Sequence, residues 1–191
     1  MKMTIRWNRF ANYTTLPLGL VLMLCLQSID SGWAQNKTGD AVSPSAQAEG
    51  VLDLLGDLPN PRRIDVSELH SLPRMEVRTT DPHDPGKEIV YSGTTLVETL
   101  KTGGLVLDSG MAGLRDAVKM TVIVEATDGY RAVFSLAELD PELTDRIILL
   151  ADTKDGQPLP PREGPLRIIV PGEKRPARWV RQVKALTVRN N

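Results

Sequence analysis

The sequence predicts an α+β fold that is β-rich, with mixed sheets and a few short helices. The first observation is a series of short apolar, β-branched segments, the clearest being residues 120–126. The second is that turn-forming pairs such as Asp128-Gly129 and Pro171-Gly172 separate these segments. The third is that the helix-start patterns are followed by only a few residues before the next turn.

The first 34 residues have the features of a secretory signal peptide. Basic side chains lie near the start, at Lys2, Arg6 and Arg9. An apolar segment follows at residues 16–26, and Gly32-Trp33-Ala34 places small residues before Gln35. This order predicts a signal peptide over residues 1–34 and a periplasmic protein. The apolar segment is shorter than the roughly 20 residues of a spanning helix, so a membrane anchor is the weaker alternative. A lipoprotein acylated at Cys25 is a third.

The rest of the chain predicts one domain after a short linker. Residues 35–50 are polar and small, which is typical of a flexible linker, and residues 51–191 are long enough for one domain. Cys25 is the only cysteine, so removal of residues 1–34 leaves no disulfide. The formal net charge is -1, which gives no general electrostatic reason to bind nucleic acid.

Short helices and a strand are predicted in the first half of the domain. Residues 67–70 suit one helical turn before Pro73, and residues 75–79 alternate as a strand does. Thr95-Leu96-Val97-Glu98 is a capping-box pattern, which predicts a helix that ends at Gly103-Gly104.

The second half is predicted to be mostly strands. Residues 120–126 and 130–134 flank Asp128-Gly129, which indicates a hairpin. Ser135-Leu136-Ala137-Glu138 is a second capping box and begins a short helix. Three further strands are predicted at residues 147–151, 166–170 and 183–188.

Several motifs in this order resemble one cofactor-binding family. They are the segment EIVYSGTTLVETLKTGG at residues 88–104, DGY at 128–130, DGQPL at 155–159, GPLR at 164–167 and VPG at 170–172. The chain resembles the sulfite oxidase-like oxidoreductase molybdopterin-binding domain family from about residue 51 to residue 188. The resemblance implies the family's fold and molybdopterin as a cofactor, and it places the family's short amphipathic helix within residues 88–104.

The resemblance also implies the residues that would bind the cofactor. Arg167 follows Gly164-Pro165-Leu166, as the family's pterin-binding arginine does. Arg178 and Arg181 fall where the family has a serine-x-lysine motif, and Arg181 matches the lysine as a cation. Trp179 stands in place of the serine, and Glu163 lies near an expected asparagine. The predicted cofactor-binding residues are therefore Arg167, Arg178 and Arg181.

No catalytic or metal-binding residue is predicted. The family's molybdenum-ligating cysteine belongs near Thr79-Thr80-Asp81, and the sequence has no cysteine there. His70 and His83 are the only histidines, and their spacing favours solvated positions over a zinc site. A cation site formed by Asp81, His83 and Asp84 is the alternative to a solvated loop at this position.

Basic residues concentrate near the C-terminus of the sequence. They are Arg162, Arg167, Lys174, Arg175, Arg178, Arg181 and Lys184. One interpretation is a solvated face, and the other is an anion-binding pocket in which Trp179 is either core or a stacking partner.

Two functional hypotheses follow from the sequence. The first is a non-catalytic periplasmic module that binds a small anionic ligand or a partner protein. The second is a small molybdopterin-dependent oxidoreductase that works with a partner subunit.

Overall fold

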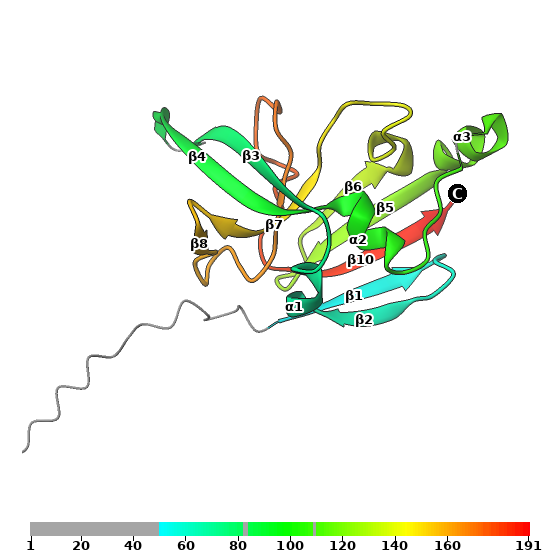
Figure 1. The fold of residues 1–191 in the computed structure, drawn as a ribbon, viewed down its shortest axis with the longest axis horizontal. Helices are drawn as coiled ribbons and strands as arrows, with labels where there is room; N and C mark the ends of the chain where they lie inside the picture. Colours follow the sequence, from blue (N-terminus) through cyan, green and yellow to red (C-terminus); the bar gives the residue numbers. More distant parts are fainter. Residues whose placement is uncertain (1–49, 82–83, 109) are drawn as a thin grey trace, which may run out of the picture. The chain divides into compact units, whose positions relative to one another are not determined.

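The computed structural model describes residues 50–81, 84–108 and 110–191 (Figure 1). The predicted signal peptide (residues 1–34) and all but the last residue of the predicted linker (35–50) lie outside the described residues. His83, which the alternative cation site requires, also lies outside them. Among the described residues, no helix is long and apolar enough to cross a membrane.

The first of two sheets is mixed. It contains β1 (Val51–Gly56), β2 (Arg62–Asp65), β5 (Met120–Ala126), β6 (Arg131–Ser135) and β10 (Val183–Asn190) in the order β2-β1-β10-β5-β6. β1 and β10 are parallel, and the other pairs are antiparallel. The first and last strands of the described chain therefore lie side by side, with β10 in the middle of the sheet (Figure 1).

The second sheet is antiparallel throughout. Its main path is β3 (Arg74–Asp81), β4 (Asp84–Thr95), β7 (Leu149–Lys154) and β8 (Gln157–Pro158), and β9 (Arg167–Ile169) also pairs with β7. The β9–β7 register places Arg167 opposite Ala151. Short β9 thus carries Arg167 into the interior of the molecule.

The helices are short and begin at capped positions. They are α1 (Val66–Leu69), α2 (Leu96–Lys101), α3 (Met111–Ala117) and the 3-10 turn η1 (Leu136–Glu138). The side chain of Thr95 accepts from the backbone N–H of Glu98 at the start of α2. At η1, the Ser135 side chain accepts from the backbone while Glu138 accepts from the Ser135 N–H, as in a capping box.

One apolar core joins the two sheets. Alternating residues of β1, β5 and β10 point inward, and buried Leu54, Val124 and Leu186 come from these three strands. Leu150 and Ile168 of the second sheet belong to the same cluster of buried side chains. Burial of this surface, rather than any disulfide, stabilises the described domain.

The β5–β6 hairpin confirms the prediction made from Asp128-Gly129. β5 has the predicted bounds, and Gly129 adopts a φ of 86°. The Gly129 N–H donates to the carbonyl of Ala126 (3.1 Å), while Asp128 Oδ1 accepts from the Tyr130 N–H (2.8 Å). Glycine fits this left-handed position because it has no Cβ.

Two local predictions are corrected by the structure, and one helix was not predicted. The strand predicted at residues 147–151 lies at Leu149–Lys154, because its partner β4 ends at Thr95, opposite Leu149, where α2 begins. The segment from Asp84, predicted as a solvated loop, is exposed but is the start of β4, a strand that also fills the first part of residues 88–104. Helix α3 was not predicted, since its N-cap is Gly110 and no side chain caps it.

Candidate anion-binding cleft

A cleft of about 410 Å³ lies between the β5–β6 turn, the loop at residues 160–164 and the segment that precedes β10. We call it the arginine cleft. Its described lining residues are Ala126, Asp128, Tyr130, Arg162, Pro176, Ala177, Trp179, Val180, Arg181 and Gln182. The cleft thus gathers side chains that are up to 56 positions apart in sequence (126 to 182).

Gln182 ties together two of the walls of the arginine cleft. Its φ is 49°, a left-handed value that is uncommon for a residue with a side chain. The Gln182 carbonyl accepts from the Thr127 N–H (3.0 Å), and its side-chain Nε2 donates to the carbonyl of Pro161 (2.9 Å). Its own N–H donates to the carbonyl of Glu163 (2.9 Å). These bonds fix the β5–β6 turn relative to the 160–164 loop.

Tyr130 ties the same turn to the third wall. Its hydroxyl donates to the carbonyl of Ala177 (2.7 Å), although half of its surface remains exposed. Trp179 forms the buried side of the cleft and donates from Nε1 to the carbonyl of Val170 (3.0 Å). Trp179 is therefore a core residue, with an edge-to-face contact to Tyr91 at 6.3 Å between ring centroids.

Two arginines in the arginine cleft are free to bind a ligand. The side chains of Arg162 and Arg181 are exposed, and neither makes a hydrogen bond or an ion pair with another described residue. Asp128 is the one carboxylate among the described lining residues, and one of its oxygens already accepts from the Tyr130 N–H. The lining consequently has a surplus of positive charge.

Arg167, the first predicted cofactor-binding residue, is buried and already paired. It is 7% exposed. Its Nη1 forms an ion pair with Glu163 and donates to the Tyr91 hydroxyl (3.1 Å). The guanidinium lies 5.5 Å from the Tyr91 ring centroid and 5.7 Å from that of Trp179. Arg167 therefore packs behind the arginine cleft and is not among the described residues that line it.

The surroundings of Arg167 form a small polar cluster within the core. Lys154 Nζ lies 3.5 Å from Glu163 Oε1, so two cations share one carboxylate. Burial raises the pKa of the Tyr91 hydroxyl, and the nearby Arg167 and Lys154 charges only partly oppose that rise. Arg167 Nε is buried without a hydrogen-bond partner among the described residues.

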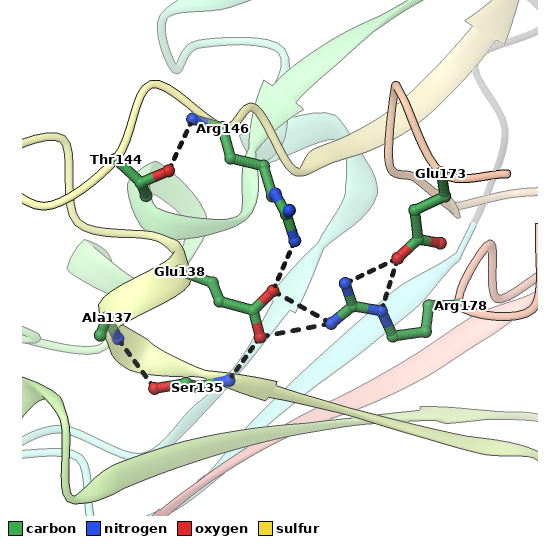
Figure 2. A network of polar contacts seen from close by, with 7 residues as sticks. All are labelled: Ser135, Ala137, Glu138, Thr144, Arg146, Glu173 and Arg178. Carbon is green, nitrogen blue, oxygen red and sulfur yellow. Dashed lines mark hydrogen bonds and ion pairs between the residues drawn. The ribbon is translucent and has the colours of Figure 1, made fainter.

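Arg178, the second predicted cofactor-binding residue, forms ion pairs with the loop that carries Glu173 and with η1, which carries Glu138 (Figure 2). It donates from Nε to Glu173 (2.7 Å) and from Nη1 to Glu138 (3.2 Å to Oε2). Its guanidinium carbon lies 4.6 Å from the Phe134 ring centroid. Burial acts to lower the pKa of Arg178, but its hydrogen bonds to Glu173 and Glu138 outweigh burial and leave the pKa raised.

Glu138 is the centre of that network. Its carboxylate also accepts from Arg146 (3.0 Å) and from the Ser135 N–H (3.2 Å), as Figure 2 shows. Arg178 therefore forms ion pairs with two carboxylates of its own chain, so its positive charge is not available to a ligand.

The structure does not bring the three predicted arginines to one cleft. Arg181 lines the arginine cleft, whereas Arg167 and Arg178 are absent from its described lining. Sequence reasoning included Arg162 in the basic cluster but did not select it as a binding residue. No local sequence pattern indicates that Arg162 and Arg181 line one cleft. They do so because the hydrogen bonds of Gln182 hold the 160–164 loop beside the β5–β6 turn.

A second cleft of about 410 Å³ is more apolar. Met75, Val97 and Leu139 belong to its lining, together with Arg74 at the start of β3. Arg74 donates two hydrogen bonds to the buried carboxylate of Asp152, one of them from Nη2 to Oδ1 (2.7 Å). His70 Nε2 lies 3.4 Å from the same carboxylate. Within the described chain, no group of three metal-binding side chains lies close enough to hold an ion.

Comparison with known proteins identifies the fold. No protein-family model matches the chain, and no curated protein matches it. Among solved structures, the sulfane dehydrogenase SoxCD from Paracoccus pantotrophus has a similar fold, with a TM-score of 0.57 and 18% sequence identity. The similarity covers 79% of this chain but 40% of that chain.

This likeness establishes the fold class and goes no further. The β-rich α+β fold predicted from the sequence is confirmed, and over the matched part the chain has a fold similar to that of the dehydrogenase chain. The chain spans less than half the length of the dehydrogenase chain that it matches. Function has to be argued from the site, since one fold hosts many functions.

Proposed function

We propose that this protein is an exported, non-catalytic module that binds a small anionic ligand in the arginine cleft. The observation that carries the proposal is the pair Arg162 and Arg181, two exposed guanidinium groups on one cleft without carboxylate partners among the described residues. A planar guanidinium offers paired N–H donors to a phosphate or carboxylate. Two such groups on one cleft favour an anion that bridges them.

The size and stiffness of the arginine cleft support a small ligand. Its volume of about 410 Å³ falls within the range of small-molecule sites. Gln182 and Tyr130 hold the three walls by hydrogen bonds, so binding requires little ordering of the backbone. Pre-organised sites lose less affinity to conformational entropy.

A titration with simple oxyanions tests the proposal. Trp179 is the only tryptophan after residue 34 and borders the cleft, so its fluorescence reports binding of phosphate or sulfate. Each of Arg162→Ala and Arg181→Ala should weaken binding roughly tenfold or more, because a charge-assisted hydrogen bond contributes about 1.5–3 kcal/mol.

Arg189→Ala is the matched control. Arg189 is exposed on β10 and is not among the described lining residues, so its loss makes the same charge change away from the cleft. Equal affinities in wild type and both cleft variants, or the absence of any oxyanion binding, would refute the proposal and favour a partner-binding surface.

Molybdopterin is the second candidate ligand. In that case the protein would be a small oxidoreductase that acts with a partner subunit. The fold likeness and the sequence resemblance favour this candidate. The residues fit the cofactor only in part, because Arg181 has no partner among the described residues while Arg167 and Arg178 are already paired with carboxylates. Metal analysis of protein produced in a host that makes the molybdenum cofactor distinguishes this candidate, since stoichiometric molybdenum would favour it over a cofactor-free module.

Export through a cleaved signal peptide, and hence a periplasmic location, is part of the proposal. The mature chain is expected to begin at Gln35. Intact-mass measurement on protein recovered from the periplasm tests this start, and a diacylated Cys25 species would contradict it.

A further inference from the structure

β3 is the longest edge strand of the two described sheets. It ends the second sheet and has eight residues, whereas the other end strands β2, β6 and β8 have four, five and two. Native edge strands are commonly shortened, or protected by charged side chains (lysine above all), proline or a bulge. Residues 74–80 contain neither proline nor lysine and pair with β4 in continuous register. Among the described residues, no strand pairs with this edge, and its remaining protection is the charge of Arg74, Glu76 and Arg78.

The hydrogen bonds of β4 show which backbone groups of β3 face the open edge. Val90 donates its N–H to Asp155 Oδ1 (2.9 Å), and its carbonyl accepts from the Asp155 N–H (2.7 Å). Both backbone groups of Val90 thus point away from β3. Arg78 lies opposite Val90, so in an antiparallel pair its own N–H and carbonyl point to the open edge. Because the direction alternates along a strand, the same holds for Glu76.

The charges along β3 are complementary to those of a second, antiparallel copy of β3. Suppose that a second copy pairs antiparallel with residue 77 opposite residue 77. Glu76 of each copy then lies opposite Arg78 of the other copy, and this contact occurs twice. Opposite charges directly across a ladder stabilise the pair, and like charges destabilise it. One register of two identical strands is therefore favoured by charge.

The present contacts of these two side chains leave them available. Among the described residues, Glu76 accepts a single, long hydrogen bond from Ser92 (3.4 Å), and Arg78 lies 3.6 Å from Glu88. The side chains of Arg78 and Glu88 are 65% and 64% exposed, so their ion pair contributes little to stability.

We propose that two copies of this chain form a symmetric dimer through antiparallel pairing of β3, centred on Val77. The second sheet would continue from one copy into the other, with about eight new backbone hydrogen bonds from residues 74, 76, 78 and 80. A second copy is the fitting partner because the same strand supplies both charges of each pair. The arginine cleft is formed by other elements, so the dimer and the ligand proposal stand independently.

Charge reversal tests the dimer and its register together. The purified protein is examined by sedimentation velocity over a concentration series. Each of Glu76→Arg and Arg78→Glu places like charges opposite each other at both symmetric positions and should raise the dimer Kd about tenfold. The double variant restores both opposite-charge pairs and should regain a Kd near that of wild type.

The controls separate dimerisation from folding. Both side chains are exposed, so circular dichroism and Tm should be unchanged in every variant. Arg189→Glu makes the same charge change on the first sheet and should leave the Kd unchanged. A wild type that remains monomeric at all concentrations, single variants that dimerise as wild type does, or a double variant weaker than either single would each overturn the proposal.

Discussion

Loss of Arg167 should destabilise the folded protein and not only weaken the binding of a ligand. Its guanidinium is buried between Tyr91 and Trp179 and pairs with Glu163. Breaking a buried ion pair by removal of one partner costs about 3–5 kcal/mol. Lys154 remains 3.5 Å from Glu163 and partly neutralises its carboxylate. The free energy of unfolding of Arg167→Ala should therefore be lower by an amount near the lower end of this range, about 3 kcal/mol.

Denaturant unfolding followed by circular dichroism measures this loss. For a domain of this size, a change of about 3 kcal/mol corresponds to a Tm lowered by roughly 6–12 °C. Arg162→Ala is the matched control, because that arginine is exposed and unpaired among the described residues and should change stability by less than about 0.5 kcal/mol. If Arg167→Ala unfolds like wild type but loses oxyanion binding, the structural role assigned to Arg167 is wrong and the ligand role predicted from the sequence is correct.

Two further predictions concern the β5–β6 turn and the polar cluster behind the arginine cleft. Gly129→Val should destabilise the protein by about 1–2 kcal/mol, measured by denaturant unfolding, because φ is 86° while no heavy atom lies near an added Cβ. Gly129→Asn should lose less, and equal losses in both variants would contradict a conformational cause. Burial raises the pKa of Tyr91 in the folded state above its ordinary value near 10, so its contribution to stability is present below pH 10 and is lost as pH rises through the folded pKa. Unfolding free energies measured from pH 8 to 11 should therefore fall less steeply for Tyr91→Phe than for wild type, and parallel curves would exclude Tyr91 as the cause.

The parts of the fold that the sequence predicts well are those determined by neighbouring residues. Residues 120–126 are rich in β-branched side chains and match β5, while Thr95 and Ser135 cap the helical turns that their patterns indicate. Asp128-Gly129 forms its turn because the side chain of Asp128 and the φ of Gly129 act within a few residues. Such signals survive folding because tertiary contacts do not oppose them.

The candidate site was harder to predict because its charges are paired across the fold. Glu138 lies 40 positions before Arg178, and no local pattern joins them. The pair Glu163 and Arg167 does have a local spacing of four residues, but its depth of burial depends on Tyr91, which lies 76 positions from Arg167. Which arginines remain free for a ligand is therefore decided by tertiary contacts and not by the order of residues.

The place of β10 has a consequence for the timing of folding during synthesis. This strand lies between β1 and β5, so the first sheet remains in two separate pieces, β1 with β2 and β5 with β6, until residues 183–190 have left the ribosome. A two-stranded unit is at best marginally stable in water. The strands of the first sheet should therefore stay loosely paired and accessible to chaperones until β10 inserts between these two strand pairs.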